Sequence, residues 1–235
     1  MSPYFSIIIP TLNEEKNIGN LLKDLKNQSI LNFETIVVDG NSDDNTVKLA
    51  SEYGVNIVET KTRGVANQRN LGASGARGEY LLFMDADNTL KSDFLMNLKI
   101  KINGCRPDVF TCYVENKLKS RKEIATANII NFYIQVMYWI KSPGAIGACI
   151  GCKRSIFNKS NNFLQNLVPF EDGYFVRNLS KNGYNCVIFD NPKFGYSQRR
   201  FEENGYLKTF GKYLSMQIKR KVLKSKVEYV MGGKG

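Results

Sequence analysis

The chain has 235 residues, 43% hydrophobic and 23% charged, which is ordinary for one globular domain or one domain with an appendage. Its formal net charge of +11 indicates partners with negative charge, such as phosphorylated substrates, nucleic acid or an acidic membrane surface. Histidine is absent, which excludes a His-ligated metal and acid–base chemistry by imidazole. Five cysteines, an odd number, argue against a disulfide framework and for a reducing, cytoplasmic compartment. No signal peptide is expected, because a strand is predicted almost at the first residue.

Strands and helices are predicted to alternate over the first hundred residues. Short apolar runs indicate strands at 5–9, 35–38, 55–58 and 80–84. Helices are expected at 14–25, at about 45–53 and at about 65–76. Glu14 and Glu15 are expected to open the first helix, because acidic residues in a first turn suit the helix dipole. This alternation predicts an α/β fold with a parallel sheet and helices on both faces.

The second half begins with a helix that Ser92 is expected to cap and that runs to about residue 102. Strands are predicted at 108–114, 147–152 and 187–189, with a long apolar helix at 121–140. Amide side chains interrupt that helix, which favours a buried or interfacial helix over a membrane span. Cys149 and Cys152 form a Cys-x-x-Cys pair, but without a second pair or any histidine they are expected to be structural thiols.

The strand at 80–84 ends abruptly in two carboxylates, Asp85 and Asp87. Side chains at i and i+2 of an extended chain point the same way, so both can converge at the carboxyl end of the strand. Open α/β sheets bind ligands at that edge, and two oxygen ligands suit a hard divalent cation that also holds phosphate. Taken alone, an Asp-x-Asp of this kind is more often a solvated acidic turn.

Three predicted strands end in polar segments that would share one edge of the sheet: residues 10–14, 39–42 and 85–87. Their acidic and amide groups can bond a nucleobase and ribose hydroxyls and hold a metal against a diphosphate. No Gly-x-Gly-x-x-Gly follows the first strand, and no Gly-x-x-x-x-Gly-Lys-Ser/Thr occurs. A Rossmann-type dinucleotide site and a P-loop NTPase are therefore disfavoured.

The first hundred residues resemble the inverting family 2 glycosyltransferases of GT-A fold. The segments that carry the resemblance, in this order and spacing, are SIIIPTLNEE at 6–15, IVVDGNSDDNT at 36–46, RNLGA at 69–73 and GEYLLFMDAD at 78–87. Each segment alone is weak evidence, whereas four in order are strong evidence. The resemblance implies a nucleoside-diphosphate sugar donor, a UDP- or GDP-sugar, and a divalent metal, Mn²⁺ or Mg²⁺.

The resemblance also implies roles for individual residues. The residues expected around the base and ribose are Pro10, Thr11, Glu14, Asp39 and Gly40. Arg69, Asp85 and Ala86 complete the expected nucleotide site, and Asp87 is expected as the main metal ligand with Asp85 supporting it. Gly151 and Glu171 are expected against the transferred sugar and the acceptor. Without the resemblance, Arg69 is as readily explained as a surface arginine of a helix.

A second chemical segment, EDGYFVR at 171–177, matches the Glu-Asp-x-x-x-x-Arg element of the family. The resemblance makes Asp172 the general base that deprotonates an acceptor hydroxyl. Single displacement with inversion needs a base opposite the leaving diphosphate, and a positioned carboxylate can serve. Without the family, the paired acids are best explained as the start of a helix.

Arg199 and Arg200 lie where many family members carry a histidine near the metal. Guanidinium groups match phosphate oxygens, so these arginines are expected to hold the diphosphate, with solvated surface arginines as the alternative. The segment 207–230 is basic, with apolar residues at helical spacing. It is expected either to lie on an anionic membrane surface, on the cytoplasmic side, or to pack on the core with a solvated basic face.

Together these features predict a glycosyltransferase that moves a sugar from a nucleoside-diphosphate sugar to an acceptor hydroxyl or a polyprenyl phosphate, with inversion. The acceptor is expected to be a glycan or lipid-linked. Residues 1–200 would form the catalytic domain, with a nucleotide-binding half at 1–104 and an acceptor-binding half at 105–200, followed by a basic helical extension at 201–235. A sugar-phosphate nucleotidyltransferase is the alternative enzyme, although the chain lacks its Gly-rich, Arg-containing loop. A basic nucleic-acid-binding module is the non-enzymatic alternative; no nucleic-acid partner is expected, because acids gather at the strand ends.

Overall fold

A computed structural model of the chain describes residues 2–115, 121–139, 143, 148–160, 162–165 and 171–195. All of them belong to one compact unit, Met1–Tyr196. The predictions for Arg199 and Arg200 and for the extension at 201–235 lie outside the described residues.

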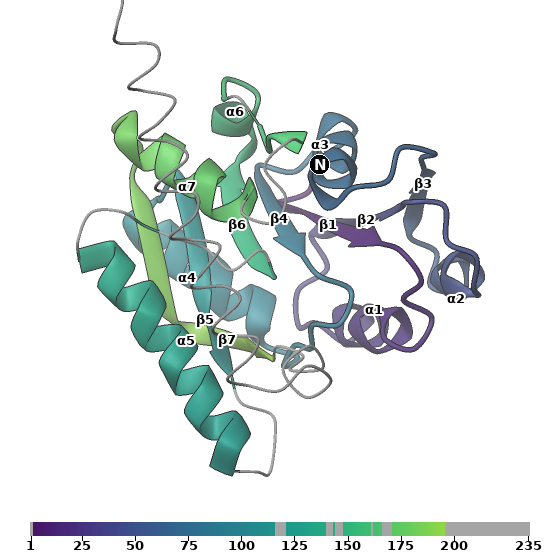
Figure 1. Cartoon of the computed structure of the whole chain (residues 1–235), viewed down its shortest axis with the longest axis horizontal. Coiled ribbons are helices and arrows are strands. Elements are labelled where there is room, and N and C mark those ends of the chain that lie inside the picture. Colours follow the sequence, from purple (N-terminus) through teal and green to yellow (C-terminus); the bar gives the residue numbers. More distant parts are fainter. Residues whose placement is uncertain are drawn as a thin grey trace, which may run out of the picture. The chain divides into compact units, whose positions relative to one another are not determined.

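In the described part of the chain, seven strands form one sheet in the order β3-β2-β1-β4-β6-β5-β7 (Figure 1). The strands are β1 Phe5–Thr11, β2 Phe33–Asp39, β3 Asn56–Glu59, β4 Tyr80–Met84, β5 Val109–Glu115, β6 Cys149–Lys153 and β7 Cys186–Gly195. Strand β6 runs antiparallel to β4 and β5, and the other pairings are parallel. The predicted mostly parallel α/β sheet is therefore confirmed, and β1, β2, β4 and β5 present their carboxyl ends at the same edge.

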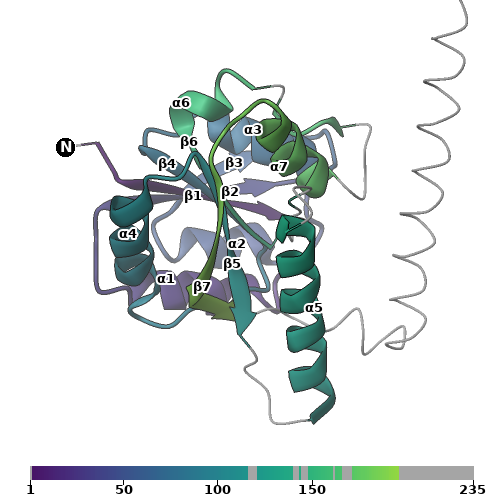
Figure 2. The ribbon, with the colours of Figure 1, turned by 90° about the vertical axis from the view of Figure 1, so that its left-hand side faces the viewer.

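Helices cover both faces of the sheet (Figure 2). They are α1 Ile18–Lys26, α2 Thr46–Ser51, α3 Val65–Ser74, α4 Phe94–Cys105, α5 Arg121–Trp139, α6 Arg154–Phe157 and α7 Glu171–Lys181. Buried residues of α1, α2 and α4 pack in one apolar cluster, and those of α3, α6 and α7 pack in a second. The two clusters are the two faces of the sheet.

Alternation along the strands explains why the strand sequences are apolar throughout. In β1, Ile7 and Ile9 belong to the cluster of α1 and α4, whereas Ile8 belongs to the cluster of α3 and α7. In β4, Leu82 and Phe83 divide in the same way. A strand covered by helices on both faces has no polar side, so it appears in the sequence as a continuous hydrophobic run.

Two predicted helix starts are wrong. Helix α1 begins at Ile18, and Glu14 and Glu15 precede it, because their backbone N–H groups donate to side chains of the next loop instead. Helix α4 begins at Phe94 with Asp93, not Ser92, at the N-cap position. The carbonyl of Ser92 accepts from the Ser29 N–H, so Ser92 belongs to the loop that precedes the helix.

The structure gives Gly151 a packing role. Gly151 pairs with Leu82 and Phe110 inside the sheet, and a Cβ on it would lie 1.9 Å from Cζ of Phe110. The space that the missing side chain leaves is therefore filled by an aromatic ring. The expectation that this glycine makes room for a sugar has to be corrected at this position.

Replacing Gly151 with alanine is expected to destabilise the protein by about 1–3 kcal/mol, because an extra methyl in a packed core displaces its neighbours. Urea unfolding of the purified variant measures this. Gly104→Ala is the control: nothing lies within 4 Å of the added methyl in helix α4, and alanine is the better helix former. That variant should equal or slightly exceed the wild type in stability. Equal stability of the two variants would contradict the packing role.

Candidate active site

The carboxyl ends of β1 and β2 are joined through Asp39. This residue is the last of β2 and is buried. Its Oδ1 accepts hydrogen bonds from Thr11 Oγ1 at 2.9 Å and Ser42 Oγ at 2.6 Å, and its Oδ2 accepts from the Ser42 N–H at 2.8 Å. Asp39 and Thr11 thus lie together as predicted, and these bonds hold the loop that follows Gly40.

A buried amide, Gln68 on α3, fixes the same corner and was not predicted. Its Nε2 donates to the carbonyl of Thr11 at 2.7 Å and to that of Val38 at 2.8 Å. The Gly40 N–H also donates to the Thr11 carbonyl, at 2.9 Å. A Cβ on Gly40 would come within 3.1 Å of Gln68 Nε2. A polar residue among the small residues of α3, directly before Arg69, was the sequence signal for this role.

The loops after β1 and β2 are bound to each other over several residues. The Asn13 N–H donates to Ser42 Oγ at 2.9 Å, and Asn13 Oδ1 accepts from the Asp43 N–H at 2.8 Å. The Glu14 N–H donates to Thr46 Oγ1 at 2.8 Å. These bonds place Glu14 at the carboxyl edge of the sheet, as predicted, although it stands outside helix α1.

Arg69 links the third loop to helix α7. Its side chain is only 2% exposed, which excludes the alternative of a surface arginine. Nη2 donates to Asp85 Oδ1 and Nη1 donates to Glu171 Oε1, both at 3.1 Å. The guanidinium lies 5.3 Å from the centre of the Phe163 ring. A buried arginine therefore holds two of the predicted site carboxylates, from β4 and α7, in one group.

Asn70 holds the ring on which Arg69 lies. Its Nδ2 donates to the Phe163 carbonyl at 2.8 Å, and its Oδ1 accepts from the Phe163 N–H at 3.0 Å. An asparagine one residue after the arginine thereby ties the segment before α7 to α3. Sequence reasoning included Asn70 in a motif without assigning it this contact.

The electrostatics of the group follow from its burial. Burial raises the pKa of the Glu171 carboxyl above its usual range, and the charge of neighbouring Asp172 adds to the rise, while Arg69 opposes both. Asp172 is half-buried in the first turn of α7, where its Oδ1 accepts from the Gly173 N–H. Asp172 is thus carried by a helix whose first residue is bonded to the β4 edge through Arg69.

Asp85 and Asp87 follow β4 as the sequence predicted. Both are half-buried, and Ala86 between them is buried. The Asn88 N–H donates to the Asp85 carbonyl at 3.1 Å, so residues 85–88 form a turn, and the extended chain predicted for Asp85 and Asp87 is wrong. The Asp85 N–H donates to the Ala148 carbonyl at 3.4 Å, and the Asn88 side chain also donates to that carbonyl. Among the described residues, no three Cys, Asp or Glu side chains gather as a complete metal site. One or two carboxylates do fit a cation whose remaining ligands are phosphate and water.

Pro10 lies near the end of β1, paired with Val38. Cys149 and Cys152 are buried free thiols in β6, as predicted.

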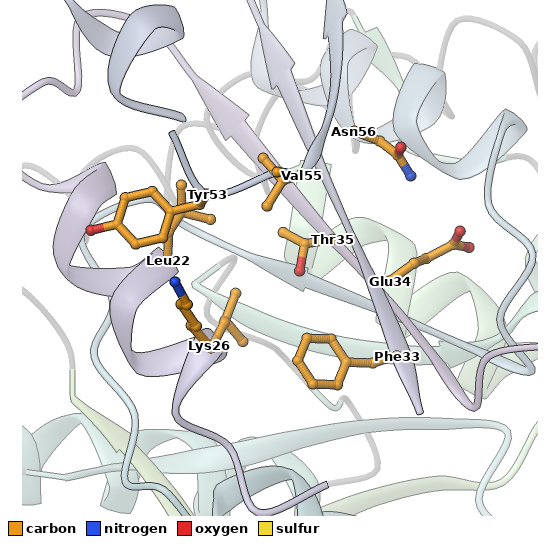
Figure 3. A pocket seen from close by; sticks show the side chains of 10 residues that line it. Leu22, Lys26, Phe33, Glu34, Thr35, Tyr53, Val55 and Asn56 are labelled. Atoms are coloured by element: carbon orange, nitrogen blue, oxygen red, sulfur yellow. The ribbon is translucent and has the colours of Figure 1, made fainter. Parts of the chain in front are cut away.

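A cavity of about 360 Å³ lies at the opposite edge of the sheet from Asp39, Asp85 and Asp87. Figure 3 shows the side chains that line it. It is lined by the end of α1, the beginning of β2 and the turn before β3, including Leu22, Phe33 and Tyr53. Because the amino ends of the strands form this edge, the cavity is separate from the candidate site.

The sequence profile described as glycosyl transferase family 2 matches residues 6–160. The chain belongs to this family. Its fold is similar to that of the mannosyltransferase PcManGT from Pyrobaculum calidifontis, solved with GDP-Man and Mn²⁺. The TM-score is 0.68 and the identity 19%, over 92% of this chain and 65% of that one. The predicted GT-A fold is therefore confirmed for the described residues.

Among curated glycosyltransferases, the chain is 34% identical over 113 residues to the poly(ribitol-phosphate) β-N-acetylglucosaminyltransferase TarS of Staphylococcus aureus, covering 45% of this chain and 20% of TarS. It is 37% identical over 95 residues to a PGL/p-HBAD biosynthesis glycosyltransferase of Mycobacterium bovis, covering 38% of this chain and 37% of that protein. Residues 1–349 of TarS, solved with UDP-GlcNAc, match at a TM-score of 0.63 and 22% identity over 82% of this chain and 58% of that one. The chain spans well under half the length of these two curated relatives.

Proposed function

We propose that this family 2 member transfers a sugar from a nucleoside-diphosphate sugar to an acceptor, with inversion at the sugar carbon. The observation that carries the proposal is the Arg69 bridge, which ties Glu171 on α7 to Asp85 at the end of β4. Asp172, the candidate base, follows Glu171 on α7. The Arg69 bridge therefore fixes the start of this helix against the strand end that carries Asp85, where the donor is expected to bind. Structural neighbours solved with UDP-GlcNAc and with GDP-Man support a UDP- or GDP-sugar as the donor class.

The loops after β1 and β2 are the proposed base and ribose site. Thr11, Asp39 and Gly40 are held in place by Gln68 and Ser42, so their positions do not depend on a bound donor. A site preorganised in this way loses little conformational entropy on binding. Pro10 and Glu14 flank the same corner, and Ala86 lies beside Asp85 on the third loop.

Asp87 is the proposed main ligand of a divalent cation, Mn²⁺ or Mg²⁺, and Asp85, whose Oδ1 accepts from Arg69, is the supporting ligand. Two carboxylates of this kind suit a cation that the donor diphosphate also binds. Such a cation supplies charge neutralisation to the departing diphosphate. Arg199 and Arg200 are proposed to contact the same diphosphate, since guanidinium groups pair well with phosphate oxygens.

Asp172 is the proposed general base. It accepts the proton of the acceptor hydroxyl as the acceptor oxygen attacks the sugar carbon and the bond to the diphosphate breaks. Attack opposite the leaving group in one step inverts the configuration of that carbon. Glu171, buried against Arg69, positions the start of α7 for this step. A polyprenyl phosphate acceptor is already ionised and would need no base.

A panel of nucleotide sugars tests the donor class by thermal unfolding. A ligand that binds the native protein alone stabilises it, by about 2.7 kcal/mol at a hundred times its dissociation constant. We expect a UDP- or GDP-sugar to raise the melting temperature, more strongly with Mn²⁺ than with EDTA. In Asp87→Asn the Mn²⁺-dependent part of the rise should be lost, while Asp93→Asn, at the start of α4, should behave as the wild type. A panel with no stabilising nucleotide sugar would overturn the proposed donor.

A further inference from the structure

Helix α5 carries an apolar face that no described residue covers. Its exposed apolar residues are Ile124, Ile129, Phe132, Tyr133 and Trp139, with Phe132 66% and Trp139 69% exposed. The opposite side of the helix packs on the protein: Ile134 is buried, Asn131 bonds both backbone groups of Val114, and Gln135 bonds Tyr113. Helix α5 is therefore fixed on the protein by its inner side, and its outer face stays exposed among the described residues.

The chemistry of this face suits the interface of a lipid bilayer. From Ile124 to Trp139 the sequence contains no charged residue. Tryptophan and tyrosine favour the headgroup level of membranes, where one part of the ring is apolar and another polar. No helix in the described part of the chain has the length and apolarity needed to cross a bilayer. A helix with one apolar exposed face and limited hydrophobicity instead lies in the plane of the interface.

Charge in the neighbouring sequence points to anionic lipid. Just before the uncharged stretch the chain carries four basic residues, Lys117, Lys119, Arg121 and Lys122, against the single acid Glu123, and Lys141 follows it. Basic residues beside an apolar helix face add attraction to anionic headgroups of roughly 1 kcal/mol each near the surface. Positive charge on both sides of the uncharged stretch of the sequence therefore favours an anionic partner over a second copy of the same basic chain.

The placement of α5 agrees with this partner. Figure 2 shows the first part of α5 running beyond the end of β5, on the side of the sheet where the parallel strands end. That edge also carries Asp39, Asp85 and Asp87. The uncovered face of α5 therefore extends past the edge of the sheet that carries the candidate site.

We propose that the outer face of α5, defined by Ile129, Phe132, Tyr133 and Trp139, docks on an anionic lipid bilayer surface. This surface is distinct from the basic segment at 207–230 for which membrane contact was expected from the sequence. It does not depend on the proposed transferase reaction, and lipid binding and donor binding are measured separately.

The test is co-sedimentation of the full chain with vesicles of phosphatidylglycerol and phosphatidylcholine, compared with phosphatidylcholine alone. We expect binding to the anionic vesicles, and a drop of about tenfold or more in the partition coefficient for Phe132→Ser/Trp139→Ser, which removes two large apolar side chains without changing charge. Leu31→Ser/Ile100→Ser is the matched control, because Leu31 is 81% and Ile100 60% exposed on other elements. Its partition coefficient should equal that of the wild type.

Four results would overturn the proposal. They are no binding of the wild type to anionic vesicles, equal binding to neutral vesicles, undiminished binding of the α5 variant, or a dimer in sedimentation analysis that the α5 variant alone dissolves. Undiminished binding would place lipid contact on another segment, and a dissolved dimer would assign the face to a second copy. The melting temperatures of both variants show whether they remain folded.

Discussion

Replacing Asp172 with asparagine is expected to lower kcat by about 10²–10⁴-fold with a hydroxyl acceptor, the usual contribution of a positioned general base. Asparagine keeps the shape of the side chain and can still accept from the Gly173 N–H, so helix α7 should begin as before. The KM for the donor should change little, because the proposed base and ribose site lies on the loops after β1 and β2. Steady-state rates at saturating donor measure the effect.

Two comparisons separate base catalysis from a general loss of structure. Asp190→Asn changes an exposed carboxylate of β7, whose contact is a 3.8 Å pair with Lys101, and should retain full activity. A phosphate acceptor, already ionised, should be used by Asp172→Asn at nearly the wild-type rate. Wild-type rates of Asp172→Asn with a hydroxyl acceptor would remove this residue from the mechanism.

Replacing Arg69 with methionine is expected to destabilise the protein by about 3 kcal/mol at neutral pH. Removing one partner of a buried pair leaves the other charge uncompensated, which typically costs about 3–5 kcal/mol. The lower end applies because Glu171 is 8% exposed but Asp85 is 37% exposed and partly screened by water. Methionine keeps apolar contact with Phe163, so the change removes mainly the charge. Urea unfolding at several pH values measures it.

The deficit of Arg69→Met should depend on pH with a defined sign. The pKa of Glu171 is raised in the folded protein, mainly by burial, so its charged form opposes folding as pH rises above its ordinary value of 4.5. Without Arg69 that opposition grows, because the guanidinium no longer lowers this pKa. The variant should therefore approach wild-type stability in acid, where Glu171 is protonated, and fall furthest below it at neutral pH.

Arg63→Met is the control for this experiment. Arg63 makes a 3.4 Å ion pair with Asp43, but both side chains are more than half exposed. Exposed pairs contribute about 0–1 kcal/mol, so the loss should be small and nearly independent of pH. Equal losses for the two arginine variants would mean that the Arg69 bridge does not stabilise the site.

The strand pattern illustrates what local sequence can reveal. The run at 80–84 has no polar residue and ends in Asp85, so burial on both faces and a polar carboxyl end could be predicted before any coordinates. The helix starts at 14–18 and 92–94 could not. At both starts, backbone groups that a local helix would use are bonded to residues far away in the sequence: the N–H groups of Glu14 and Glu15 to the loop after β2, and the Ser92 carbonyl to the Ser29 N–H.

The sequence by itself determined the α/β alternation, the strand ends that carry Asp39, Asp85 and Asp87, and membership in a family of sugar transferases. Periodicity and polarity along the chain are sufficient for those statements. Tertiary structure alone decided that Arg69 bonds a glutamate 102 positions away, that Gln68 joins two strand ends, and that Phe110 fills the space at Gly151. Such contacts depend on how helices and strands pack on one another, which residue spacing within a segment does not encode.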